Sequence, residues 1–227
     1  MKINEITAFG ADPEDKEFFE ELWTDCQPYL KDIDYKPTEF PLYRGMTGEP
    51  SQLGGIKRVR LDNRRPKDTT PKDHAELNDY FQKNYRHPYR NGLFATSVKG
   101  IAGAYGSAQA IFPVGAYECI WSPDITDLYS HIIDYTDFAY ENWNEYRGYL
   151  GLDQDDFWDK VEKGQITAVN VLRFREDYHD AGYIQGKIKA GIHSNNEIMI
   201  WCESYYYIPP DGLMPLHSFI NKKLSES

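Results

Sequence analysis

The chain has 227 residues, 41% of them hydrophobic and 15% aromatic, which is enough apolar surface for the core of one large domain over 1–227. Its formal net charge of −11 disfavours non-specific binding to nucleic acid or to an anionic membrane, because both surfaces repel an acidic protein. Three widely spaced cysteines indicate neither a disulfide framework nor a Cys-x-x-Cys metal site. No signal peptide and no apolar run near the ~20 residues of a membrane span is evident, so we expect a cytoplasmic protein with no membrane partner.

The first third of the chain predicts a helical start, one short strand and a basic loop. Asp12, as an N-cap before Pro13, opens a helix with an apolar stripe, and we assign 1–36 to an N-terminal helical segment. Residues 42–46 indicate a strand that carries one cation, Arg44, among apolar neighbours. The run 57–72 is basic and interrupted by prolines, which favours a solvated loop, although such a run could also contact phosphates or an acidic partner.

The central stretch 91–106 passes from a strand-like run into a helix of small residues. Leu93 and Phe94 favour an extended backbone, and the Thr96–Ser97 pair supplies two hydroxyl groups. The glycines that follow are spaced G-x-x-G-x-x-G, which is not the dinucleotide fingerprint, and would lie on one helical face as a device for close packing. The stretch by itself fits a packed core helix and a ligand-binding turn equally well.

The other predicted elements come from hydrophobic periodicity and from breaker residues. We expect helices over 73–85, from about 124 to 149 and over 153–163, the last ended by Gly164. The β-branched run 166–174 is the clearest strand by composition, and further extended segments are expected over 110–114, 116–121, 197–202 and 205–208. The acidic residues of the middle third indicate a solvated face.

Glu197 is the second informative residue, because strand alternation places it on the same face as Met199 and Trp201. A carboxylate at such a position is costly unless it is paired, hydrogen-bonded or open to a cleft. Alternatively, Glu197 could mark the solvent-exposed end of the strand. The six histidines have no paired spacing, so we expect no metal site, and no G-x-S-x-G elbow indicates a hydrolase nucleophile.

Three ordered motifs resemble the mono-ADP-ribosyltransferase superfamily, in its arginine, serine, glutamate branch. Leu42-Tyr43-Arg44-Gly45 is similar to the first motif, Phe94-Ala95-Thr96-Ser97 to the Ser-Thr-Ser motif, and Asn195-Asn196-Glu197 to the third. The strands after Glu197 resemble the closing strands of bacterial and bacteriophage members, and the resemblance spans about 40 to 208. It implies an α+β fold of two small, mostly antiparallel sheets with surrounding helices, and a transferase core over 40–208 that binds NAD as substrate.

The resemblance also implies roles for individual residues. Glu197, Arg44 and Ser97 would be catalytic, and Arg44, Tyr43, Gly45, Phe94, Thr96 and Ser97 would bind NAD, with Asn195 on the side of the acceptor. Ala95 stands where the family has its first serine, so the hydroxyl must come from Thr96 or Ser97 or be absent. Asn195 stands where transferases that modify arginine have a glutamate, which makes arginine less favoured as the acceptor.

We therefore expect transfer of ADP-ribose from NAD to a macromolecule, a protein in preference to a nucleic acid, in the host cytoplasm if the chain is of bacteriophage origin. Two alternatives stay open. The acidic, aromatic region 124–180 could instead belong to a non-enzymatic interaction protein that binds a basic partner. The same fold could also hydrolyse NAD, with water in place of the acceptor.

Overall fold

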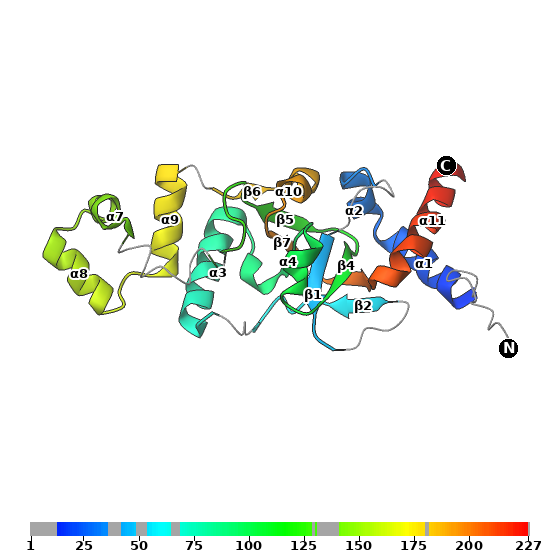
Figure 1. Ribbon diagram of the computed structural model, residues 1–227, viewed down its shortest axis with the longest axis horizontal. Coiled ribbons are helices and arrows are strands. Elements are labelled where there is room, and N and C mark those ends of the chain that lie inside the picture. Colours follow the sequence, from blue (N-terminus) through cyan, green and yellow to red (C-terminus); the bar gives the residue numbers. More distant parts are fainter. Residues whose placement is uncertain are drawn as a thin grey trace.

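The computed structural model describes residues 13–35, 42–48, 54–64, 69–128, 130, 141–179 and 182–226. Within these ranges the fold is α+β, with two small antiparallel sheets and surrounding helices, as expected (Figure 1). The first sheet has the order β1-β4-β8-β2, with bounds Leu42–Met46, Ser107–Pro113, Ser204–Ile208 and Gly55–Arg58. The second sheet has the order β3-β7-β5-β6, with bounds Leu93–Ala95, Ile198–Trp201, Glu118–Trp121 and Ile184–Gln185.

A single β-bridge joins the two sheets. Tyr43 N donates to Thr96 O at 2.7 Å, and Thr96 N donates back to Tyr43 O at 3.0 Å. Tyr43 lies in β1 and Thr96 directly follows β3, so the bridge fastens the strand of Arg44 to the strand of Phe94. The first two motifs of the sequence therefore meet at the junction of the sheets.

Helices cover both sheets and lengthen the molecule at its two ends (Figure 1). At the end where the described chain begins and ends, the helices are α1 (Pro13–Asp25), α2 (Gln27–Asp32) and α11 (Pro210–Glu226). Around the second sheet lie α3 (Pro71–Tyr85), the short η1 (Tyr89–Asn91), α9 (Ala168–His179) and α10 (Ile188–Ser194). The helix α4 (Lys99–Gly103) contacts β1 and β4, and α7 (Trp143–Leu150) and α8 (Gln154–Glu162) form a lobe beyond α9.

Strand alternation divides the buried side chains of the second sheet between two cores. Leu93, Ala95, Ile198 and Ile200 join the central core, which also holds the first sheet and helices α1, α2 and α11. Their neighbours Phe94, Ile120, Met199 and Trp201 face the lateral core under α3 and α9. Glu197 immediately precedes β7 and, by the same alternation, belongs to the lateral face.

Several predicted elements are confirmed where the structure describes them. The strand over 42–46 matches β1, the 73–85 helix matches most of α3, and the 153–163 helix matches α8. Gly164 does end that helix, with a φ of +60° that favours glycine. Four acidic residues of α8 and its cap are exposed, as a solvated face requires: Asp153, Asp155, Asp156 and Asp159. Asp12, and residues 129 and 131–140 of the expected 124–149 helix, lie outside the described residues. The start of that expected helix is wrong, because residues 124–127 are not helical, whereas its end matches α7.

The predicted strand over 166–174 is wrong, because most of this run forms α9, Ala168–His179. Asn170 Oδ1 accepts hydrogen bonds from both N and Oγ1 of Thr167, which begins the helix in the manner of a cap. One side of α9 packs into the lateral core and another into a separate lobe core with α7 and α8. A helix that is buried on two sides has no continuous polar face, so its sequence lacks the helical repeat of polar residues and resembles the apolar run of a buried strand.

Two further expectations need correction. The 57–72 run is not one loop, since Gly55–Arg58 is strand β2 and helix α3 begins at Pro71, capped by the side chain of Thr70; residues 65–68 lie outside the described part. Of the three glycines after Ser97 that were expected to pack closely, only Gly106 does so. The helix there has only 5 residues, and a Cβ added at Gly100 or Gly103 would meet nothing within 4 Å.

Close packing occurs instead at Gly45 and Gly106. A Cβ at Gly45 would lie 2.2 Å from Ala102 O, and Gly106 has a φ of +137° beside the main chain of Met46. These contacts hold α4 and the start of β4 against β1. The three cysteines are free and buried, and no helix among the described residues is long and apolar enough to cross a membrane.

Candidate functional site

The turn before β7 fixes the position of Glu197 through main-chain and amide hydrogen bonds. Glu197 N donates to Thr126 O at 2.9 Å. Its neighbour Asn196 is buried, and its Nδ2 donates to Ser122 O at 2.8 Å and to Pro123 O at 2.7 Å. Asn195 adopts a left-handed conformation with a φ of 62°, which ends α10 and turns the chain into the strand. The carboxylate is thus held on a rigid turn between α10 and β7.

The Glu197 side chain is half-buried, and one of its two carboxylate oxygens lacks a hydrogen-bond donor. Its Oε1 atom is buried and has no hydrogen-bond partner. Burial, together with the charge of Asp127, raises the pKa of Glu197 to about 7, although Arg90, a main-chain hydrogen bond from Leu128 and Arg64 each lower it. Such a carboxylate is costly to keep in a purely structural role, and it is available to a cation or to a developing positive charge.

The strand register shows which residue of the second motif faces Glu197. Phe94 pairs with Met199 and Ala95 with Ile198 in the antiparallel β3–β7 ladder, so the next step along the register opposes Thr96 to Glu197. Directly opposed residues share one face of a sheet. Ala95 belongs to the opposite face and is buried in the central core. A hydroxyl group at position 95 would therefore point away from Glu197, and Thr96 is the residue that can offer one.

The hydroxyl groups of Thr96 and Ser97 both bond to Asn195. Thr96 Oγ1 lies 3.4 Å from Asn195 O and accepts from Val98 N at 3.1 Å. Ser97 Oγ donates to Asn195 Oδ1 at 3.0 Å. These bonds fasten the second motif to the turn of the third motif, two residues before Glu197. The expected acceptor-side residue, Asn195, is thus joined to both hydroxyl residues.

Arg44 reaches the same junction from β1. Its Nη1 donates to Phe94 O at 2.9 Å, so the guanidinium group spans the gap between the first sheet and β3. The side chain of Tyr43 is 5% exposed within the central core, whereas Phe94 is half-buried on the lateral face. Of the two aromatic residues expected to bind NAD, Phe94 is therefore the more accessible.

Two functional candidates were missed by the sequence analysis, Arg64 and Arg90. Their guanidinium carbons lie 4.5 Å and 4.8 Å from the centroid of the Phe94 ring, which is a cation–π geometry for each. Arg64 belongs to the basic run that favours a solvated loop or, as the alternative, a contact with phosphates or an acidic partner, and Arg90 follows the His-Pro-Tyr sequence before β3. Basic composition near Phe94 was the only signal that could have indicated them.

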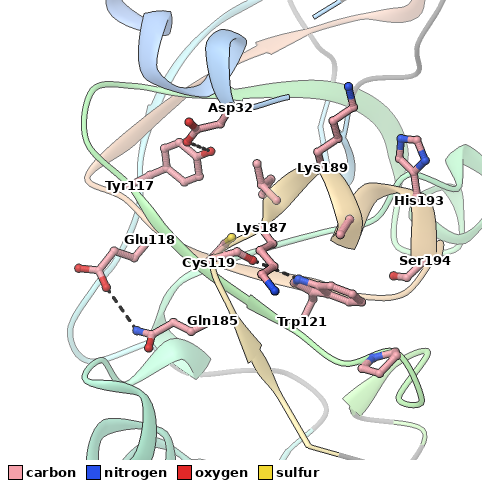
Figure 2. Close-up of a pocket in the computed structure, with 14 residues that line it drawn as sticks. Asp32, Tyr117, Glu118, Cys119, Trp121, Gln185, Lys187, Lys189, His193 and Ser194 are labelled. Carbon is pink, nitrogen blue, oxygen red and sulfur yellow. Dashed lines mark hydrogen bonds between the residues drawn. The ribbon is translucent and has the colours of Figure 1, made fainter. Parts of the chain in front are cut away.

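A separate pocket of about 1220 Å³ lies on the other face of β5, beside α10 (Figure 2). Its walls include Cys119 and Trp121 from β5 and the side chains of Lys187 and His193 from the start and end of the α10 region. The Trp121 indole donates to Gly186 O at 3.1 Å. Arg44, Phe94 and Glu197 do not line this pocket, so it is distinct from the predicted site residues.

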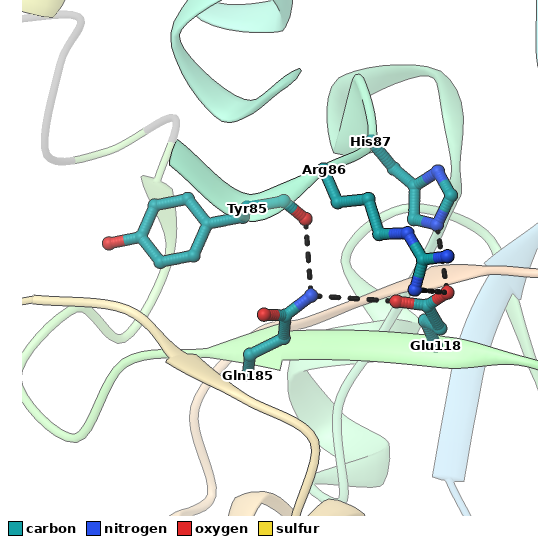
Figure 3. Close-up of polar contacts among 5 residues, drawn as sticks. All are labelled: Tyr85, Arg86, His87, Glu118 and Gln185. Carbon is teal, nitrogen blue, oxygen red and sulfur yellow. Dashed lines mark hydrogen bonds and ion pairs between the residues drawn. The ribbon is translucent and has the colours of Figure 1, made fainter. Parts of the chain in front are cut away.

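A polar cluster at the edge of β5 anchors the chain before Arg90 (Figure 3). Glu118 Oε1 accepts from His87 Nε2 at 3.0 Å and from Arg86 Nη1 at 3.3 Å, and Gln185 bonds to the other carboxylate oxygen at 3.5 Å. The His87 ring also stacks on Trp201, with ring centroids 4.9 Å apart. The cluster holds the segment that carries η1 and Arg90 against the second sheet.

The described residues contain no group of three or more His, Cys, Asp or Glu side chains placed to hold a metal ion. The chemistry of the junction is instead that of one carboxylate, two hydroxyl groups and arginines around an aromatic ring. No protein-family model, no curated protein and no solved structure matched the chain.

Proposed function

We propose that this chain is a mono-ADP-ribosyltransferase that uses NAD as its substrate. The observation that carries the proposal is that the three motifs are bonded to one another at the junction of the two sheets. Arg44 donates to Phe94 O, Tyr43 bridges to Thr96, and Thr96 and Ser97 bond to Asn195 in the turn before Glu197. The order of the three motifs along the sequence independently nominates Arg44, the Thr96–Ser97 pair and Glu197 as site residues. The α+β architecture with two antiparallel sheets is compatible with an ADP-ribosyltransferase-like fold over 40–208.

In the proposed reaction the bond between ribose C1′ and the nicotinamide nitrogen breaks, and its electron pair leaves with the nicotinamide. Positive charge then develops on the ribose, where the ionised Glu197 carboxylate stabilises it more than it stabilises the ground state. A nucleophilic atom of the acceptor attacks C1′ and loses its proton. Because Oε1 of Glu197 has no hydrogen-bond donor of its own, its charge is free to act on the ribose.

The remaining residues would bind and orient the substrate. Phe94 offers a half-buried ring for the nicotinamide, while Tyr43 and Gly45 shape β1 beneath the site. Thr96 and Ser97 would hold the Asn195 turn and could also donate hydrogen bonds to ribose hydroxyl groups. Asn195, exposed at the end of α10, lies where a macromolecular acceptor, preferably a protein, could approach.

The decisive experiment combines NAD labelled in the adenylate phosphate with a cell extract as the source of acceptors. Wild type should release nicotinamide and label a macromolecule, and Glu197→Gln should lower both by at least two orders of magnitude. The matched control is Glu203→Gln, which removes an exposed carboxylate in the β7–β8 turn and should leave both rates unchanged. No nicotinamide release by wild type, or equal rates for Glu197→Gln, would refute the proposal.

The form of the product separates transfer from hydrolysis. If the label accumulates only as free ADP-ribose while Glu197→Gln is inactive, water is the acceptor and the chain is an NAD glycohydrolase. Labelled macromolecules that resist protein denaturants establish transfer. A partner retained equally by wild type and Glu197→Gln without nicotinamide release would favour the acidic interaction protein instead.

A further inference from the structure

Three arginines converge on Phe94, although the chain as a whole carries a net charge of −11. Arg44 donates to the main-chain oxygen of Phe94, and Arg64 and Arg90 lie over its ring. Burial together with the charges of Arg90 and Arg64 lowers the pKa of the neighbouring His74. The face of Phe94 is therefore a local region of positive potential in an acidic protein.

Arg90 is the most informative of the three arginines, because it is buried and takes part in no ion pair among the described residues. Arg90 is only 4% exposed, and its Nη2 donates to Thr69 Oγ1 at 3.1 Å. Its Nε atom is buried and has no hydrogen-bond partner. Within the described ranges, no carboxylate lies within the 4.0 Å of an ion pair with Arg90. A buried guanidinium group in this state costs free energy that an anion would recover.

Arg64 brings a second positive charge to the same ring. It is half-buried, and its Nη1 donates to Gly92 O, so the guanidinium group is fixed next to the start of β3. Two like charges held near one aromatic ring repel each other, and an anion placed between them would relieve that repulsion. A diphosphate carries charge on two adjacent phosphoryl groups, so one ligand can contact both guanidinium groups.

The arginines are held in place before any ligand arrives. Asn91, which follows Arg90, accepts from His74 Nε2 at 3.0 Å and from Asn78 Nδ2 at 3.1 Å, and its own Nδ2 donates to Leu61 O at 3.0 Å. The latter bond ties the η1 segment to the segment that ends in Arg64. On the other side, the Glu118 cluster fixes Arg86 and His87 (Figure 3). Such preorganisation lowers the entropic cost of binding.

We propose that Arg64 and Arg90 form a diphosphate-binding site over the Phe94 ring, beside Glu197. Arg44, whose Nη1 is engaged by Phe94 O, supports the strand that carries the ring. For the identity of the ligand, the diphosphate of NAD, this inference rests on the proposed function. Oε1 of Glu197 and Nε of Arg90 both lack a hydrogen-bond partner, and NAD offers a positively charged glycosidic nitrogen to the first group and a negatively charged diphosphate to the second.

Calorimetric titration with ADP and with inorganic pyrophosphate tests the site without requiring catalysis. Wild type should bind both, with affinity that falls as salt concentration rises, and should bind adenosine at least tenfold more weakly than ADP. Arg90→Gln and Arg64→Gln should each weaken ADP binding by about tenfold or more, because each removes a charge-assisted contact. The control Arg60→Gln removes an exposed cation from the same segment as Arg64 and should change the affinity less than twofold.

If Arg90→Gln fails to fold because Arg90 is buried, Arg64→Gln still tests the site. The circular dichroism melting curve of each variant shows whether it is folded. The inference is overturned if wild type binds neither ADP nor pyrophosphate, or if both folded variants bind ADP as tightly as wild type. ADP binding that depends on Arg90, without nicotinamide release from NAD, keeps the diphosphate site and removes the transferase. If NAD cleavage depends on Glu197 but its KM is unchanged in both arginine variants, the transferase is kept and the diphosphate site is removed.

Discussion

Thr96 is bonded to Tyr43 through both of its main-chain polar groups, at 2.7 Å and 3.0 Å, and this pair is the bridge between the two sheets. The residue that faces Glu197 in the strand register therefore also sets the position of β1. Any shift of β1 relative to β3 would move Arg44 and Thr96 together. A change in how the two sheets pack would therefore also change the geometry of the site.

Glu197→Gln should stabilise the protein at neutral and alkaline pH. The folded-state pKa of Glu197, about 7, lies above its ordinary value of 4.5. Between pH 4.5 and pH 7 the Glu197 carboxyl group therefore keeps its proton in the folded chain and loses it in the unfolded chain. Stability contributed by the neutral carboxyl is therefore lost as pH rises from about 4.5 to 7. Removing the charge should recover between about 1 and 3 kcal/mol at pH 8 and almost nothing near pH 4.

Urea denaturation at both pH values measures this difference, with Glu203→Gln as the control for loss of a surface carboxylate. An equal effect of Glu197→Gln at pH 4 and pH 8 would show that Glu197 is not an acid with a raised pKa in the folded protein.

The rate of nicotinamide release should rise with pH and level off above the pKa of Glu197, near 7. The ionised carboxylate is the form that stabilises positive charge on the ribose, so the protonated enzyme is inactive. A profile of kcat/KM between about pH 5.5 and 9 reports this pKa for the free enzyme. A flat profile across neutrality would disagree with an essential carboxylate at this position.

Ala95→Ser should destabilise the fold without improving catalysis. The register places Ala95 in the central core, where an added hydroxyl group finds only apolar neighbours and costs about 1–2 kcal/mol. Thr96→Ser keeps the hydroxyl that bonds to Asn195 and should retain most of the activity, whereas Thr96→Val should lose it. Melting temperatures and nicotinamide release measure the two effects. A gain in turnover for Ala95→Ser would mean that the hydroxyl belongs at position 95.

Gly45→Ala and Gly100→Ala should have opposite effects on stability. The new Cβ at Gly45 would lie 2.2 Å from Ala102 O, and the main chain there cannot move away cheaply, so we expect a loss of about 3 kcal/mol or more. The new Cβ at Gly100 meets nothing within 4 Å and lies in a helix, which favours alanine by up to about 1 kcal/mol. Thermal denaturation of both variants provides the test, and equal effects would contradict the packing of α4 on β1.

The sequence was informative where function depends on short local patterns. Arg44, Phe94 and Glu197 were singled out as candidates because each stands in or next to a recognisable strand, and those three strands form where the sequence predicts extended segments. Arg64 and Arg90 were missed because their contacts with Phe94 depend on how the segments around α3 fold back onto β3. No local pattern encodes such a tertiary contact.

The assignment of secondary structure failed where burial removed the periodic signal. Helix α9 was predicted as a strand since β-branched residues such as Val169 and Val171 face two different cores. The role of Ala95 was also open in the sequence, because a shift of one residue moves a side chain to the other face of a sheet. Only the pairing of β3 with β7 decides between Ala95 and Thr96.

The two-sided burial of α9 also divides the molecule into units that can open separately. Val171 and Phe174 pack with Tyr146 and Phe157 in the lobe, while Leu172 packs under the second sheet. Loss of the lobe therefore exposes one side of α9 and leaves its other side covered. In hydrogen exchange, amides of α7 and α8 should exchange through a local opening of lower free energy than those of β7, and α9 should follow the slower strands.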